Sequence, residues 1–96
     1  MREWRVSIEG AASGAAEQEL VELVERLGHA EARGPVCRLR GDAPAATFGV
    51  IADTAADAAV AASFMFDEAT GVDVAALEVR VHEDVDAAVT AAPSAQ

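Results

Sequence analysis

The sequence predicts an α+β fold in which two helices cover one face of a four-stranded antiparallel sheet. Along its 96 residues the hydrophobic pattern alternates between the two-residue period of a strand and the period of a helix, about 3.6 residues. Strands are expected near residues 4–9, 36–40, 47–52 and 77–82, and helices near residues 17–27 and 55–69. This order is the split βαβ pattern, which buries one face of every element in a single layer between sheet and helices.

The first strand and the first helix carry the clearest periodicity. Trp4, Val6 and Ile8 alternate with polar residues, so these three side chains are expected to face the core. The first helix has an apolar stripe at helical spacing, formed by Ala16, Leu20, Leu23, Val24 and Leu27. We expect Gly28 to end this helix, because glycine adopts the left-handed conformation of a helix C-terminus without strain.

The next two strands are expected to form a hairpin at one edge of the sheet. The pair Gly34-Pro35 interrupts the second strand, and proline cannot donate a hydrogen bond to a neighbouring strand, so an edge position is predicted. Residues 41–44 contain glycine, aspartate and proline and are predicted to form the turn. The core-facing residues of the third strand are expected to be Phe48, Val50 and Ala52.

The second helix has clear ends but no clear face. Thr54 followed by Asp57 resembles a capping box, and Gly71 is expected to end the helix. The run Phe64-Met65-Phe66 spans about 200° of the circumference, so one narrow stripe cannot bury all three side chains. We place the core on the side of Ala56, Val60 and Ser63, which leaves an outer side that contains Ala58, Ala61 and Ala62.

Two explanations of this excess apolar surface are open. Either the second helix contacts another subunit through Met65 and Phe66, or the C-terminal segment covers it through Val85 and Val89. The last strand is expected to turn Leu77, Val79 and Val81 inward. The predicted domain spans residues 1–83, and the segment 84–96 is predicted to be a short helix or a disordered tail.

Arginines are expected to gather on the face of the sheet that no helix covers. In the split βαβ pattern the strands normally follow the order 4-1-3-2. The candidate interaction surface on this face consists of Arg5, Arg38, Arg40, Arg80, His82 and Ile51. Because arginine presents a planar fork to carboxylate and phosphate, this surface suits an acidic partner or an anionic ligand. The alternative is a solvated face with ordinary cross-strand ion pairs, such as Arg5 with Glu78 or Glu9 with Arg80.

Composition excludes several classes of function. The formal net charge of −10 argues against nucleic acid and anionic membrane surfaces as partners, because both need a basic footprint. No aromatic residue is expected on the open face, which argues against base stacking on RNA. The single cysteine, Cys37, cannot form an internal disulfide and is expected to be a small buried side chain. No spacing of histidines or cysteines suits a metal ion, so neither metal nor cofactor is expected.

The sequence shows neither a targeting signal nor a membrane-spanning segment. No apolar stretch approaches the length that spans a bilayer, and no signal-peptide pattern precedes the first strand. We therefore expect a cytoplasmic protein.

The element order and the composition together resemble known small proteins. A chain rich in Ala, Gly, Arg and Val, without Lys, Asn or Tyr, resembles the small ferredoxin-like proteins of unknown function that are frequent in GC-rich bacteria. The layout is also similar to that of ACT-type regulatory domains, βαββαβ modules that bind amino acids at subunit interfaces. The first turn here reads Glu9-Gly10-Ala11-Ala12-Ser13-Gly14 and differs from the acidic-x-Pro-Gly turn that such modules often show. The resemblance implies a ferredoxin-like sandwich and carries over no functional residue.

Three functions follow from these observations, in order of preference. The first is a non-enzymatic protein-interaction or regulatory module, homodimeric, that uses the open sheet face or the second helix. The second is an ACT-like sensor of a small anionic metabolite bound near the arginines. The third is a small dimeric αβ-barrel enzyme, which ranks last because the expected interior is apolar and no catalytic grouping is present.

Overall fold

The structure, a computed structural model, describes residues 1–81 of the chain. Its elements follow the expected order: β1 (Arg2–Gly10), α1 (Glu19–His29), β2 (Arg33–Arg40), β3 (Ala43–Ala52), α2 (Ala55–Thr70) and β4 (Val74–Val81). His82 and the short helix or tail predicted for residues 84–96 lie outside the described residues.

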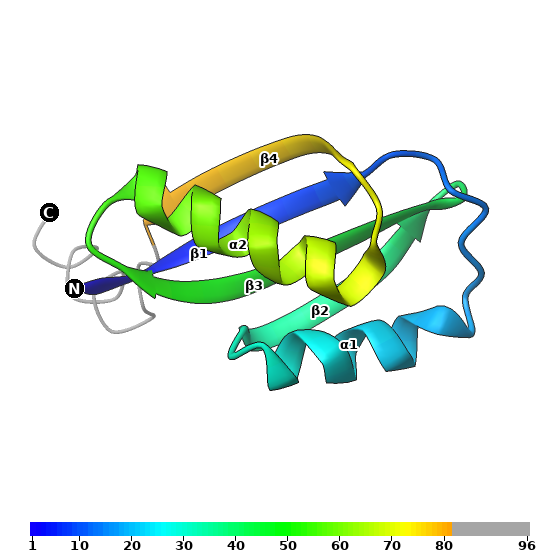
Figure 1. The fold of residues 1–96 in the computed structure, drawn as a ribbon, viewed down its shortest axis with the longest axis horizontal. Coiled ribbons are helices and arrows are strands. Elements are labelled where there is room, and N and C mark those ends of the chain that lie inside the picture. The colour runs from blue at the N-terminus through cyan, green and yellow to red at the C-terminus, as the bar shows by residue number, and fades with distance from the viewer. Residues whose placement is uncertain (82–96) are drawn as a thin grey trace, which may run out of the picture.

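The four strands form one antiparallel sheet in the order β2-β3-β1-β4. Counted from the β4 edge, this order is 4-1-3-2. Both helices lie on one side of the sheet, with α2 beside β4 and α1 beside β2 (Figure 1). The expected α+β class, with two helices and a four-stranded antiparallel sheet, is therefore confirmed. The edge position expected for β2 from Gly34-Pro35 is also confirmed, and the register of β2 shifts between Arg33 and Val36.

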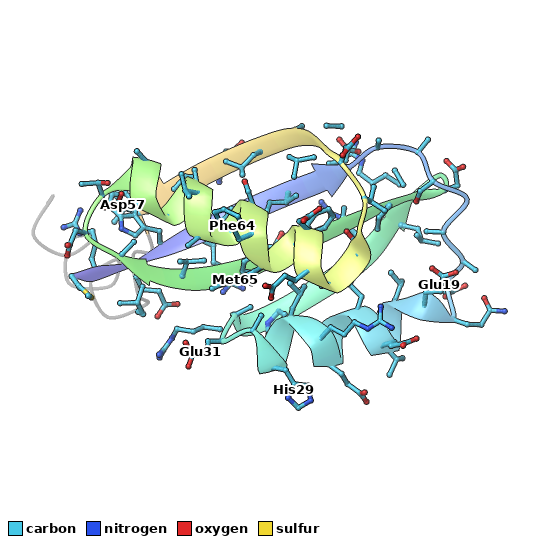
Figure 2. All side chains as sticks on the ribbon, viewed as in Figure 1. Glu19, His29, Glu31, Asp57, Phe64 and Met65 are labelled. Atoms are coloured by element: carbon cyan, nitrogen blue, oxygen red, sulfur yellow. The ribbon has the colours of Figure 1, made fainter. Side chains whose placement is uncertain are left out.

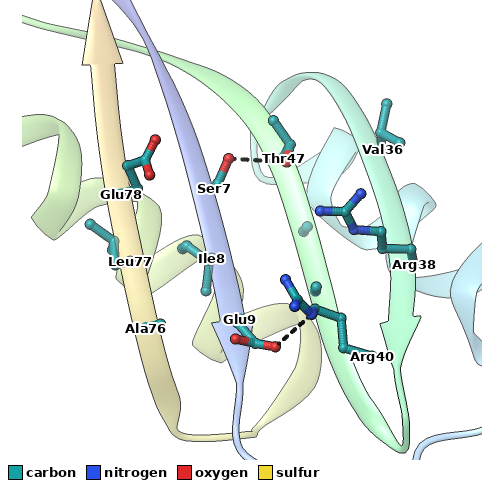
Figure 3. A pocket seen from close by; sticks show the side chains of 12 residues that line it. Ser7, Ile8, Glu9, Val36, Arg38, Arg40, Thr47, Ala76, Leu77 and Glu78 are labelled. Atoms are coloured by element: carbon teal, nitrogen blue, oxygen red, sulfur yellow. Dashed lines mark hydrogen bonds and ion pairs between the residues drawn. The ribbon is translucent and has the colours of Figure 1, made fainter.

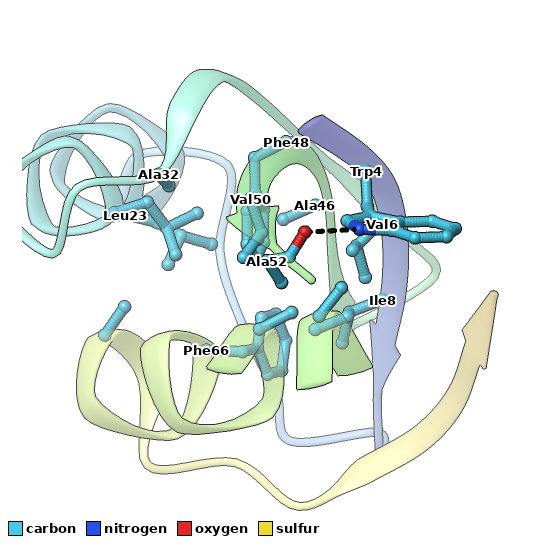
Figure 4. Close-up of a cluster of buried hydrophobic side chains, with 14 residues drawn as sticks. Trp4, Val6, Ile8, Leu23, Ala32, Ala46, Phe48, Val50, Ala52 and Phe66 are labelled. Carbon is cyan, nitrogen blue, oxygen red and sulfur yellow. Dashed lines mark hydrogen bonds between the residues drawn. The ribbon is translucent and has the colours of Figure 1, made fainter. Parts of the chain in front are cut away.

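The core lies between the sheet and the helices (Figure 4). Its largest fully buried side chains are Phe48, Phe66, Ile8, Leu27 and Val6. Trp4 closes one end of this layer, and its indole Nε1 donates a hydrogen bond to the carbonyl of Ala52 at 3.0 Å. The inward faces expected for β1 and β3 are thus confirmed. On β4, Leu77 and Val79 pack against the core, but Val81 is 45% exposed, contrary to expectation.

The first helix does not end where the sequence predicts. Gly28 lies inside α1, and the residue in the left-handed conformation is Glu31, with φ of 72° (Figure 2). The Ala32 amide donates to the Leu27 carbonyl at 2.9 Å and the Glu31 amide donates to the Gly28 carbonyl at 3.1 Å. This is the Schellman arrangement, in which hydrophobic residues on both sides of the turn pack together. Because Leu27 and Ala32 are both buried, their packing places the helix end beyond the glycine.

The face of α2 that meets the sheet was also predicted wrongly. The buried residues are Ala58, Ala62, Phe66 and Ala69, whereas Val60 and Phe64 are 57% and 67% exposed (Figure 2). Side-chain size explains this choice, because the small Ala58 and Ala62 let the helix come close to the sheet. Phe66 then fills the space against Gly10, where an added Cβ would lie 3.2 Å from its ring.

Candidate interaction face

The open face of the sheet carries a groove with a floor of small residues. In the part of β3 that pairs with β2, the residues that face outward are Ala43, Ala45, Thr47 and Gly49. The strands on either side, β1 and β2, carry long polar side chains that stand higher than this floor (Figure 3). A larger residue at Gly49 would require the Glu3 carboxylate to move, and its Cβ would lie 3.2 Å from Cβ of Arg33. The groove includes a cavity of about 320 Å³ lined by residues that include Ser7, Thr47, Arg38 and Arg40.

Five of the seven arginines lie on this face, namely Arg5, Arg33, Arg38, Arg40 and Arg80. Arg33 and Arg40 each reach across β3 to a glutamate of β1, Arg33 Nε to Glu3 Oε1 at 3.1 Å and Arg40 Nε to Glu9 Oε1 at 3.1 Å. Arg80 pairs with Glu78 on its own strand. Within residues 1–81, neither Arg5 nor Arg38 forms an ion pair.

The register of the sheet decides which charges are neighbours. Arg5 lies opposite Arg80, Ser7 opposite Glu78 and Glu9 opposite Ala76. The cross-strand pairs expected between Arg5 and Glu78 and between Glu9 and Arg80 are therefore wrong. Arg5 and Arg80 lie opposite one another instead, and the Arg5 side chain reaches across β3 toward β2, where one guanidinium nitrogen would lie 3.9 Å from a Cβ added to Gly34.

Charge is strongly segregated between the two sides of the molecule. The open face holds five arginines and three glutamates (Glu3, Glu9 and Glu78), which gives a formal charge of +2. The rest of the described chain holds two arginines and eleven acidic residues, which gives −9. One arginine of that remainder, Arg2, lies over the Trp4 ring at 5.5 Å, and the other, Arg26, pairs with Glu22 on α1.

Polar groups line the middle of the groove. Ser7 Oγ and Thr47 Oγ1 share a hydrogen bond of 3.2 Å across the β1–β3 pair. Arg38 lies in register with Ala45, and Figure 3 shows its guanidinium extending from β2 over β3 toward this pair. The groove thus presents a guanidinium and two hydroxyls to whatever enters it.

The predicted site residues are only partly brought together. Arg5, Arg38, Arg40 and Arg80 lie on the open face as expected, and Ile51 is exposed at its far end. Arg33 was missed, because the Gly34-Pro35 interruption and its register shift hide the alternation of β2. His82 lies outside the described residues.

The second predicted surface, on α2, consists of different residues from those expected. Phe66 is fully buried and Met65 is half-buried against the core, so the proposed surface role of Phe66 is wrong. The exposed residues are Val60 and Phe64, one helical turn apart. They line a shallow groove of about 430 Å³, here called the α2–β4 groove, whose other walls are Ala59, Ser63, Asp67, Val72, Asp73 and Val74.

Few side chains within residues 1–81 are placed to act as a nucleophile or to bind a metal ion. Partial burial of Cys37 raises the pKa of its thiol from 9.0 to about 11, so little thiolate forms near neutral pH. No cluster of three metal-ligating side chains occurs among residues 1–81. Neither helix of these residues is long and apolar enough to cross a membrane.

Comparison with known proteins gives no further assignment. No family model, no curated protein and no solved structure matches this chain.

Proposed function

We propose that this chain is a non-enzymatic interaction module with a ferredoxin-like fold, whose open sheet face binds a carboxylate-rich segment of another protein. The observation that carries this proposal is the charge of the face, +2 in a chain of −10, with Arg5 and Arg38 lacking a carboxylate partner within residues 1–81. The proposed resemblance to small bacterial ferredoxin-like proteins fits this role, because their layout leaves one sheet face uncovered.

The arrangement of the arginines favours an extended partner over a compact one. The five arginines are spread over three strands, β1, β2 and β4, on both sides of the small-residue floor. An exposed ion pair contributes only about 0.2–1 kcal/mol, so useful affinity requires several pairs at once. A polypeptide that carries several carboxylates along its length can supply them.

The groove itself is less suited to a small, highly charged anion. Its lining includes the carboxylates of Glu9 and Glu78 as well as the guanidinium groups of Arg38 and Arg40. A small polyanion bound there would approach both carboxylates at short range, which opposes binding. An extended acidic segment can place its carboxylates beside the arginines and its backbone polar groups elsewhere in the groove. The hydroxyls of Ser7 and Thr47 could then hydrogen-bond to the segment.

A fluorescein-labelled polyglutamate peptide tests the proposal by fluorescence anisotropy. We expect binding that weakens as ionic strength rises, because the contacts are exposed ion pairs. Arg5→Gln and Arg38→Gln should each weaken binding about two- to five-fold, and the double variant about ten-fold. Arg26→Gln, on the helix side, is the matched control and should leave the affinity unchanged.

Three outcomes would overturn the proposal. The first is no binding of the peptide at low ionic strength, and the second is an equal loss of affinity with the Arg26→Gln control. The third is complete displacement of the peptide by micromolar citrate, which would favour the small-anion sensor instead.

A further inference from the structure

The two edges of the sheet differ in how they are protected. β2 carries Pro35 and a register shift between Arg33 and Val36, two features that hinder the addition of another strand. β4 runs from Val74 to Val81 without a proline, a glycine or a bulge after Ala76. No strand within residues 1–81 pairs with its outer edge. An edge of this kind presents free N–H and C=O groups that template a further strand.

Apolar side chains lie beside this unprotected edge. Val60 and Phe64 of α2 and Val74 of β4 line the α2–β4 groove, and they are 57%, 67% and 38% exposed. Val81, at the end of the strand, is 45% exposed. A strand edge flanked by exposed apolar side chains can offer a partner both backbone hydrogen bonds and buried area.

We propose that β4 pairs antiparallel with β4 of a second copy of this chain, about a two-fold axis at Val79. In a two-fold interface each contact occurs twice, so the surface must be complementary to itself. The outward face of β4 carries a glutamate and an arginine two residues apart, Glu78 and Arg80. This axis places each of them opposite the other residue of the second copy.

Charge selects this register over its neighbours. An axis at Glu78 would bring two glutamates together, and an axis at Arg80 would bring two arginines together, which is unfavourable for directly opposed residues. An axis at Leu77 would place Glu78 opposite Ala76 and leave the charges unmatched. Only the axis at Val79 forms two Glu–Arg pairs, and both side chains are exposed enough to adopt them, at 56% and 76%.

The same register matches the helix side of the strand. It places Val79 opposite Val79 of the second copy and Leu77 opposite Val81, so apolar residues meet apolar residues. Directly opposite residues of an antiparallel pair point to the same side, so the helices of both copies would lie on one side of an eight-stranded sheet. The α2–β4 grooves of the two copies would then flank the junction, where Val60 and Phe64 would gain cover.

Charge reversal tests both the dimer and its register. We expect the wild-type chain to dimerise at high micromolar concentration in sedimentation-equilibrium experiments. Glu78→Arg and Arg80→Glu would each place like charges opposite one another twice, and each should weaken dimerisation about ten-fold or more. The double variant Glu78→Arg/Arg80→Glu restores both pairs and should dimerise as the wild type does.

Mixing the two single variants gives the sharpest result. One chain then carries two arginines and the other two glutamates, so the mixture should form a heterodimer although neither variant dimerises well alone. Both substituted positions, 78 and 80, are exposed, and far-ultraviolet circular dichroism checks that each variant is folded.

The proposal is overturned by a monomeric wild type, by single variants that dimerise as the wild type does, or by a mixture that stays monomeric. A monomeric wild type that dimerises once residues 82–96 are removed would identify that segment as the occupant of the edge instead. Arg38→Gln should leave the dimer intact, so failure of this inference is distinguishable from failure of the proposed acidic-partner binding.

Discussion

The two helices of this protein differ in opposite ways: α1 has the better-defined inner face, and α2 has the more favourable residues at its ends. α1 has a clear inner face, with Leu23 and Leu27 buried and its glutamates exposed, but the residues at its two ends are unfavourable for their positions. Gln18 precedes it without a side-chain cap, and a glutamate occupies the left-handed position after it. α2 has well-formed ends: Thr54 Oγ1 accepts the Asp57 amide at 3.1 Å, and Gly71 follows with φ of 68°.

The difference shows that a helix face and a helix end are determined by separate physics. A face is set by contrast between polar and apolar side chains, and α2 has little contrast because most of its residues are apolar. An end is set by a few side chains and backbone angles, so it needs no contrast. Each prediction below changes one of these two properties in one helix.

The largest effect should come from the two phenylalanines of α2. Phe66→Ala removes a fully buried ring and should destabilise the fold by about 3–5 kcal/mol. Phe64→Ala removes a ring that is 67% exposed and should change stability by about 0.5 kcal/mol or less. Urea unfolding followed by circular dichroism measures both, at a concentration low enough to keep the chain monomeric. Equal losses from the two variants would mean that α2 packs with a different face.

The strands and α2 differ in how far their inner faces could be predicted from the sequence. The inner faces of β1 and β3 could be predicted, because Trp4, Val6 and Ile8, and then Phe48 and Val50, alternate with other residues. On α2 both sides are mostly apolar, so side-chain size decides which side packs: Ala58 and Ala62 allow close approach to the sheet, whereas Val60 does not. Size complementarity depends on the opposite surface, which no single helix sequence contains.

The arginines of the open sheet face could mostly be predicted from the sequence, but their ion-pair partners could not. Four of its arginines follow from strand alternation alone. Their ion partners depend on register, and here the β1–β4 register brings Arg5 to Arg80 and shifts at Glu9 and Gly10. A shift of this kind arises where the chain leaves the sheet, so alternation within one strand cannot reveal it.

The next effect concerns the N-terminal ends of the helices. Thr54→Ala removes the hydroxyl that accepts the Asp57 amide and should cost about 1 kcal/mol. Gln18→Ala is the matched change at the start of α1 and should cost almost nothing, because Gln18 makes no side-chain cap hydrogen bond. Both values come from urea unfolding. A loss at Gln18 as large as that at Thr54 would contradict this account of the two ends.

The C-terminal ends should respond with opposite signs. Glu31→Gly relieves a left-handed glutamate, with φ of 72°, and should stabilise the protein by about 1 kcal/mol. Gly71→Ala introduces the same backbone strain after α2, where φ is 68°, and should destabilise the protein by a similar amount. Because an added Cβ there meets no other atom within 4 Å, no steric clash adds to this strain. Glu31→Gln separates strain from charge, because it removes the carboxylate but keeps the backbone strain. A gain from Glu31→Gln equal to that from Glu31→Gly would assign the effect to charge.

The smallest effect tests whether Gly28 has any role at the end of α1. It lies inside the helix, and a Cβ added to it would meet no atom within 4 Å. Gly28→Ala should therefore stabilise the protein by about 0.5 kcal/mol, because alanine loses less backbone entropy in a helix than glycine does. If α1 ended at Gly28 in the left-handed conformation, the same change would destabilise the protein instead. The sign of the shift in thermal midpoint therefore decides where α1 ends, and combining Gly28→Ala with Glu31→Gly should add the two gains.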